Sequence, residues 1–197
     1  MPLSRALARM RATNTLPNMT STPLPSYDPK TIALHWAGAA LVATLWLAGE
    51  FLDVFPKGTP RITVRSLHIC FGLLLGVLLA YRIWWRNTGG VQLPAPAGFK
   101  YAKQAHLAHQ VLYGAIALMV VTGIALVWIR GDNLFNLFSV PAFDPGNKEL
   151  RHNAKEVHGW LANGLLLGAA LHALMALWHQ LVLKDGVLQR MLPPRKT

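Results

Sequence analysis

The chain has 197 residues, of which 53% are apolar and only 14% are charged, and its formal net charge is +11. So few charged residues exclude an ordinary soluble globular domain and predict a membrane protein. A net charge of this size also suits a nucleic-acid-binding protein, but the placement of the charges along the chain excludes that function.

Residues 1–26 contain scattered arginines and prolines without an apolar core, so we expect a polar, disordered arm and not a signal peptide. Residues 27–197 form one domain, because the connections between its apolar stretches are short. Four stretches are long enough to cross a bilayer. Their approximate limits are 32–51, 66–84, 106–129 and 157–183. The sequence therefore predicts an all-α fold, an integral membrane four-helix bundle.

The basic residues are sorted by the side of the membrane they would face. Twelve of the 19 Lys and Arg residues lie in the N-terminal segment, the second connection and the C-terminal tail. The other seven lie in the first and third connections, together with six of the eight acidic residues. The positive-inside rule then places both termini in the cytoplasm. Charge arranged in this way serves orientation and gives no support to nucleic-acid binding.

Four of the histidines in the apolar stretches fall at two depths of the membrane. His158 and His172 are 14 residues apart on the last stretch, about four helical turns, so their side chains leave the same face roughly 21 Å apart. A hydrocarbon core is about 30 Å thick, which puts one histidine near each side. His35 opens the first stretch on the cytoplasmic side, and His68 opens the second on the outer side.

Matching these depths gives two pairs, His68 with His158 on the outside and His35 with His172 on the inside. Ionisable groups inside a membrane are costly and mark functional sites. A lone membrane histidine is usually explained by an interhelical hydrogen bond, but two pairs at matched depths favour axial ligation of two haems. Zinc fits less well, because each pair lacks the third and fourth ligands zinc usually takes.

The cysteine content decides how such haems would be held. Cys70 is the single cysteine, so no internal disulfide can form, and the chain has no C-x-x-C-H motif. Any haem is therefore bound without a covalent link, as haem b.

Further candidates cluster near the cytoplasmic ends of the last two helices: His106, His109, Trp178 and His179. Histidines there would bind water, lipid headgroups or haem propionates. The alternative is a quinone site, because quinone reduction needs a hydrogen-bond donor and protons, which histidine supplies near neutral pH. Trp178 would add an aromatic wall.

Three cations precede the outer histidines by one or two turns. Arg65 lies three residues before His68, Lys155 lies three before His158, and Arg151 lies a further turn out. They would pair with haem propionates or simply face solvent. The functional alternative is an electropositive mouth that steers a small anion to the outer haem.

Two Gly-Leu-Leu-Leu-Gly segments occur in the second and fourth stretches. Gly72 lies one turn from His68, and Gly168 lies one turn from His172. Small residues of this kind allow close helix packing. They also leave room for a flat macrocycle beside the backbone, and the two interpretations are compatible.

Together these segments resemble the bacterial cytochrome b561 family of four-helix di-haem membrane proteins. The matching segments are Ile32-Ala-Leu-His35-Trp36, Leu67-His68-Ile-Cys70-Phe-Gly72, Ala105-His106-Leu-Ala-His109, Lys155-Glu-Val-His158-Gly-Trp-Leu-Ala-Asn163, Leu171-His172-Ala173 and Trp178-His179. The resemblance extends from about Tyr27 to the C-terminus. It implies a bacterial inner-membrane oxidoreductase with two b haems held by the two pairs. It further implies that superoxide is oxidised on the periplasmic side and that ubiquinone is reduced.

Two other functions remain open at this point. Cytochrome b subunits of nickel-iron hydrogenases and formate dehydrogenases are similar in helix count and in the spacing of the last two histidines, and they relay electrons from a large periplasmic partner. The short chain favours a stand-alone protein over such a subunit. A haem-free transporter would use the histidines for metal or protons, but the near absence of Asp and Glu in the spans disfavours a cation path.

Overall fold

Four long helices make up most of the protein. The structure is a computed structural model that describes residues 26–94 and 101–193, so the predicted N-terminal arm lies outside the described residues except for Ser26. The helices are α2 (Pro29–Glu50), α3 (Thr59–Thr88), α4 (Ala102–Arg130) and α5 (Lys148–Trp178). Each is long and apolar enough to cross a membrane. The predicted four-helix membrane bundle is confirmed.

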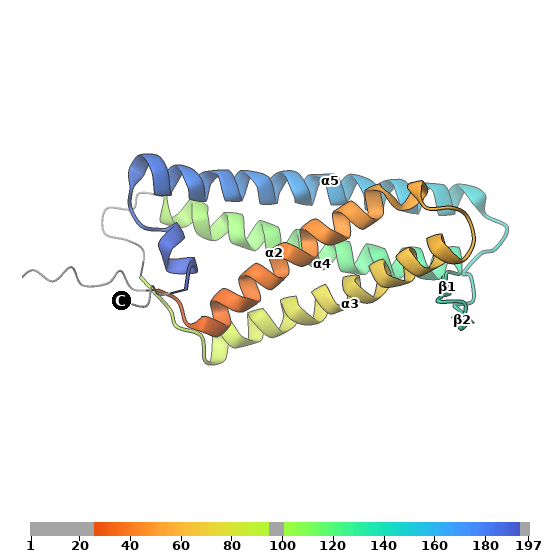
Figure 1. Ribbon diagram of the computed structural model, residues 1–197, viewed down its shortest axis with the longest axis horizontal. Coiled ribbons are helices and arrows are strands. Elements are labelled where there is room, and N and C mark those ends of the chain that lie inside the picture. Colours follow the sequence, from red (N-terminus) through yellow and green to blue (C-terminus); the bar gives the residue numbers. More distant parts are fainter. Residues whose placement is uncertain (1–25, 95–100, 194–197) are drawn as a thin grey trace, which may run out of the picture.

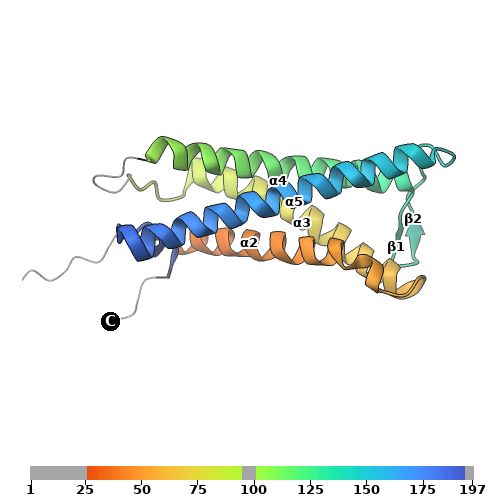
Figure 2. The same cartoon turned by 90° about the horizontal axis from the view of Figure 1, so that it is seen from above.

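The helices lie along one long axis, and the chain reverses direction at each connection (Figure 1). Helix α2 packs mainly on α3 and helix α4 on α5, and α3 contacts α4. Helix α2 crosses the bundle obliquely and reaches α5, where the indole nitrogen of Trp46 donates to Asn163 Oδ1 at 2.9 Å. Seen from above, the connections 51–58 and 131–147 share one end of the bundle (Figure 2). We call it the connection end and the opposite one the terminus end.

All four long helices begin before their predicted limits. Helix α3 begins at Thr59 instead of Ser66, and α5 begins at Lys148 instead of Val157. Hydropathy marks only the apolar part of a helix, and both segments continue as polar helix beyond it. Capping side chains fix two starts: Asp28 accepts from the backbone N–H of Thr31, and Asn147 accepts from that of Leu150.

The predicted 157–183 helix also changes form at its end. After Trp178 it continues as a π-helix, η2 (His179–Leu183). A short 3₁₀ helix, η3 (Leu188–Met191), then folds back under the bundle. The Trp36 indole N–H donates to Met191 O at 2.8 Å, and Tyr27 N–H donates to Arg190 O at 2.9 Å. Both ends of the described chain therefore meet at the terminus end, while the side of the membrane they face stays a prediction.

The α4–α5 connection contains a small hairpin. Its strands are β1 (Asn133–Leu134) and β2 (Phe138–Ser139). Phe135 and Asn136 both have positive φ, and Leu137 N–H donates to Leu134 O, which makes the turn between them type I′. Ser66 is fully buried and accepts from the Phe135 N–H at 2.9 Å, so the hairpin is fastened to α3 two residues before His68.

Candidate functional site

The structure brings the four membrane histidines together in two pairs of nearly equal geometry. The ring centres of His68 and His158 are 6.4 Å apart with planes at 70°. Those of His35 and His172 are 6.3 Å apart with planes at 72°. Two imidazoles bonded at about 2 Å to opposite sides of one metal have ring centres about 6 Å apart. We call them the outer pair and the inner pair, after the predicted orientation.

A cavity of about 500 Å³ lies at the outer pair, a volume typical of cofactor sites. Glycines on neighbouring helices make room for both imidazoles. A Cβ atom at Gly49 of α2 would stand 3.4 Å from Cε1 of His68, and one at Gly123 of α4 would stand 3.3 Å from Cε1 of His158. Neither glycine was predicted from the sequence.

A hydroxyl group fixes the orientation of one outer imidazole. Thr122 Oγ1 donates to Leu118 O at 2.9 Å, which leaves its oxygen to accept from Nδ1 of His158 at 3.1 Å. A proton on Nδ1 leaves the lone pair of Nε2 free for a metal. Thr122 was not predicted, and a hydroxyl beside a glycine in an apolar helix is the signal that could have found it.

Two arginines and a buried carboxylate stand at the rim of the outer cavity. Asp132 is only 6% exposed, and its Oδ1 lies 3.0 Å from Arg130 and 3.5 Å from Arg65. Burial raises the pKa of Asp132 even though Arg130 and Arg65 oppose the shift. The Nε atom of Arg65 is buried and has no hydrogen-bond partner among the described residues. This free donor suits a second carboxylate, so the rim fits a haem propionate.

The predicted outer cations separate in the structure. Arg65 and Lys155 line the cavity, and Lys155 Nζ lies 3.9 Å from Asp53 Oδ2. Arg151 is not among the lining residues, because it donates to Pro145 O and Asn147 O within the connection before α5. Three cations at the cavity face three carboxylates: Arg65, Arg130 and Lys155 against Glu50, Asp53 and Asp132. The charges that line the cavity are therefore balanced, and the steering of an anion to this site stays a prediction.

The inner pair has an arginine and a third histidine beside it. Arg82 Nη2 donates to Nδ1 of His35 at 3.2 Å, and its guanidinium lies 5.3 Å from the ring centre of Tyr113. The ring of His109 is 5.0 Å from that of His172, and its Nδ1 donates to Ala105 O at 2.7 Å. A small cavity of about 20 Å³ adjoins Arg82.

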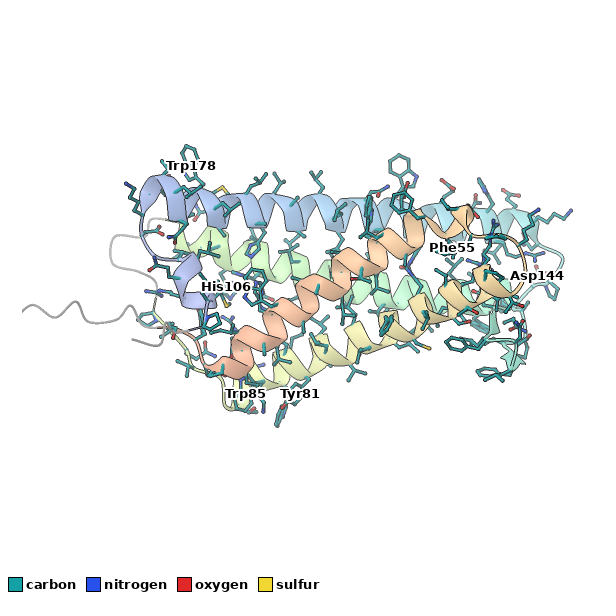
Figure 3. All side chains as sticks on the ribbon, viewed as in Figure 1. Phe55, Tyr81, Trp85, His106, Asp144 and Trp178 are labelled. Atoms are coloured by element: carbon teal, nitrogen blue, oxygen red, sulfur yellow. The ribbon has the colours of Figure 1, made fainter. Side chains whose placement is uncertain are left out.

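The four predicted quinone-site residues have different surroundings in the structure. His109 faces the inner pair, and His106 is exposed on α4. Trp178 is 54% exposed and points away from the bundle (Figure 3). His179 is buried, with its Nδ1 2.5 Å from Asp185 Oδ2. Burial raises the pKa of Asp185, but hydrogen bonds from His179 and the Val187 N–H and the charge of His179 together outweigh burial, and the net pKa is lowered.

The two glycines of the Gly-Leu-Leu-Leu-Gly segments have different surroundings. Gly72 lines the outer cavity, and a Cβ atom there would meet nothing within 4 Å. A Cβ atom at Gly168 would lie 3.4 Å from Leu112 Cδ2 of α4. Gly72 therefore adjoins open space, while Gly168 serves helix packing.

Fold and site define an integral membrane four-helix bundle with a facing histidine pair near each end. The sequence profile of the family described as "Prokaryotic cytochrome b561" matches residues 26–194. The chain belongs to this family. It is therefore a haem b electron-transfer cytochrome of the bacterial inner membrane.

The chain matches nearly the whole length of several named relatives. "Cytochrome b561 homolog 1" of Escherichia coli K12 is 35% identical over 84% of this chain and 96% of its own. "Probable superoxide oxidase CybB" of Yersinia pestis is 30% identical over 86% of this chain and 97% of its own. "Cytochrome b562" of Cereibacter sphaeroides is 32% identical over 88% of this chain and 99% of its own.

Proposed function

We propose that this cytochrome binds two b haems, one at each histidine pair, and carries electrons from a periplasmic donor to ubiquinone. The observation that supports this most strongly is the repetition of one geometry at two depths, with ring centres 6.4 Å and 6.3 Å apart. Helix α5 supplies one histidine to each pair, so one rigid element sets both sites. Bound haem supplies the one-electron chemistry, and the protein supplies ligation, orientation and charge.

At the outer pair, Nε2 of His68 and of His158 would be the ligand atoms. Thr122 holds His158 in the required tautomer, and the rim arginines Arg65 and Arg130 would hold propionates. At the inner pair, Nδ1 of His35 must carry a proton when Nε2 binds metal, and it can then no longer accept from Arg82. Arg82 then loses this acceptor and would stay beside the inner haem as a cation.

Superoxide is the donor that we propose, with a relative named a probable superoxide oxidase as support. Two superoxide anions each lose one electron and leave as O₂. One ubiquinone takes up these two electrons and two protons and leaves as ubiquinol. Lys155, which is 66% exposed at the cavity, is the cation best placed to meet an incoming anion. Lipid surrounds the apolar helix faces.

The quinone would bind near the inner pair. Of the four candidates, His109 has the strongest support, because its ring adjoins His172 and its Nδ1–H bond to Ala105 leaves Nε2 as a proton acceptor. His106 is one turn away on the same helix and exposed. His179 and Trp178 would act only at the edge of such a site.

A second donor class has its own support. The balanced charge at the outer rim gives little attraction for an anion, and it would suit a periplasmic dehydrogenase or hydrogenase that passes electrons to this cytochrome as a subunit. Purification in mild detergent distinguishes the two. A stoichiometric periplasmic partner would favour the subunit, while a lone chain that oxidises superoxide would favour the stand-alone enzyme.

Haem content tests the core of the proposal. A reduced-minus-oxidised spectrum with a pyridine haemochrome assay should give two b haems per wild-type chain. His158→Ala should remove the outer haem alone and His172→Ala the inner haem alone. His152→Ala, which alters an exposed histidine of α5, should keep both. Two haems in both pair variants would contradict the ligand assignment, and no haem in the wild type would contradict the whole proposal.

A further inference from the structure

The charged groups beside the two histidine pairs are unequal. At the outer pair the arginines share a carboxylate, since Asp132 lies between Arg130 and Arg65. At the inner pair Arg82 contacts His35 directly and forms no ion pair in the part of the chain that the structure describes. One site has compensated arginines, and the other has an uncompensated one.

Backbone contacts hold Asp132 in its place at the outer rim. Gly131 caps the end of helix α4 in the left-handed region, where φ is 67° and a Cβ atom would approach Ala142 Cβ to 2.8 Å. Asp132 N–H donates back to Val127 O, and its own carbonyl accepts from Val140 N–H at 3.0 Å. The carboxylate is therefore fixed at the cavity and does not move freely with the connection.

The acidic residues of the terminus end are engaged elsewhere. All eight acidic side chains of the protein lie within the described residues, and only Asp28 and Asp185 belong to this end. Asp28 accepts from Thr31 and from the Trp85 indole, and Asp185 accepts from His179. Arg82 therefore keeps its full charge beside His35, and its neighbour Arg86 adds a second cation at the small cavity.

An added electron is stabilised by a nearby cation and destabilised by a nearby carboxylate, and both effects grow when the groups are withdrawn from water. We propose that Asp132 and Arg82 set the direction of electron transfer: Asp132 keeps the outer haem at the lower midpoint potential, and Arg82 keeps the inner haem at the higher one. Electrons then move from the outer to the inner site with a favourable driving force. This inference rests on the proposed pair of haems but not on the identity of the donor.

Potentiometric titration of the purified holoprotein tests it. The wild type should titrate in two steps. The variant His172→Ala, which keeps only the outer pair, should show the lower potential, and His158→Ala the higher. The opposite order would overturn the proposal. Chains without haem would instead contradict the proposed function, so the two failures are distinguishable.

Variants of Asp132 test whether its carboxylate lowers the midpoint potential of the outer haem. Asp132→Asn keeps size and hydrogen-bonding atoms, and it should shift the outer potential upward while the inner stays in place. Asp132→Glu should restore the wild-type value. Asp144→Asn changes an exposed acid of the same connection that does not line the cavity, and it should shift neither. Unchanged potentials in Asp132→Asn would overturn the role of Asp132.

Variants of Arg82 test the proposal independently, so it can still be contradicted if an Asp132 variant fails to fold. Arg82→Gln should shift the inner potential downward and narrow the gap between the two steps. The matched control is Lys103→Gln, which removes an exposed cation from the same end of the bundle. A downward shift of equal size in both variants would show a general surface effect and would overturn the specific role of Arg82.

Discussion

The hydroxyl oxygen of Thr122 on α4 lies 3.1 Å from Nδ1 of His158 on α5, so a side chain on one helix sets the proton position on its neighbour. Outer partners of this kind orient metal-binding imidazoles, and their loss typically lowers affinity about 10–100-fold. Thr122→Val should therefore weaken haem binding at the outer pair by about that factor and leave the inner pair filled. Haem titration of the apoprotein measures the effect.

The matched control for this variant is Thr63→Val on α3. The Thr63 hydroxyl also donates to a carbonyl of its own helix, that of Thr59 at 2.9 Å, but it has no hydrogen bond to a histidine within residues 26–94 and 101–193. Its haem affinity should equal that of the wild type. Equal affinity in Thr122→Val as well would show that the hydrogen bond does not orient His158.

Gly123 should be sensitive to a single added methyl group. A Cβ atom there would stand 3.3 Å from Cε1 of His158, close enough that the imidazole must shift by a few tenths of an ångström. Gly123→Ala should change the ligand geometry of the outer haem and shift its low-spin EPR signal. Gly164→Ala is the control, because its Cβ atom would meet nothing within 4 Å. An unaltered spectrum in Gly123→Ala would mean that helix α4 shifts to make room for the methyl group while the His158 imidazole keeps its place.

Ser66 should hold the outer hairpin in place. Its hydroxyl donates to Ile62 O at 2.8 Å and accepts from Phe135 N–H at 2.9 Å, in a site closed to solvent. Ser66→Ala leaves that N–H without its partner, which costs about 1–3 kcal/mol. We expect a lower unfolding temperature in detergent and faster protease cleavage within residues 131–147. Cleavage at the wild-type rate would contradict this role.

Local sequence patterns were enough to predict the four helices and the depths of their histidines. Runs of apolar residues predicted the four spans, and the 14-residue interval from His158 to His172 predicted histidines at two depths in the membrane. Both could be predicted because each pattern lies within a single helix. The pairing of His35 with His172 followed from helix direction. In the structure the imidazole of His35 faces that of His172, and the outer two histidines face each other in the same way.

Residues that act between helices were not predicted. Gly49, Thr122 and Asp132 affect the outer site only through the rotation and packing of separate elements, which hydropathy does not report. Trp178 and His179 were predicted to share a quinone site, which stays a prediction, but the structure gives them different exposures. Successive residues on a helix point about 100° apart, so one side chain is exposed while the other is buried. Adjacency in sequence is weak support for a shared site.

Asp28 should make stability depend on pH. Burial raises its pKa, but hydrogen bonds from Thr31, Val91 and Trp85 outweigh burial and lower the pKa to about 2 from 3.8. The stabilisation is therefore complete above pH 3.8 and is lost as the pH falls through about 2. Asp28→Ala should cost about 1 kcal/mol at neutral pH, the usual value for a lost N-cap.

Thermal unfolding in detergent at several pH values measures this. The difference between wild type and Asp28→Ala should be constant above pH 4 and should shrink at lower pH. Asp144→Ala, at an exposed position of the other end, should follow the wild type throughout. A difference that is independent of pH would show that the lost contacts do not require the charged carboxylate.

Lys155 decides whether charge guides the donor to the outer site. Its ammonium group is 66% exposed at the cavity and lies 3.9 Å from Asp53, a distance at which exposed pairs contribute little energy, so its charge remains available to an approaching anion. Lys155→Glu should slow the reaction with superoxide severalfold, with a weaker salt dependence than in the wild type, because steering by charge is screened by ions. Stopped-flow rates at a series of ionic strengths measure both effects.

The matched control is Lys148→Glu, which reverses a charge at the start of α5. Lys148 does not line the cavity, so the rate of this variant should stay near that of the wild type. Equal rates in both variants would contradict the role of Lys155 in steering and would show that the balanced charges at the rim cancel its attraction for an anion.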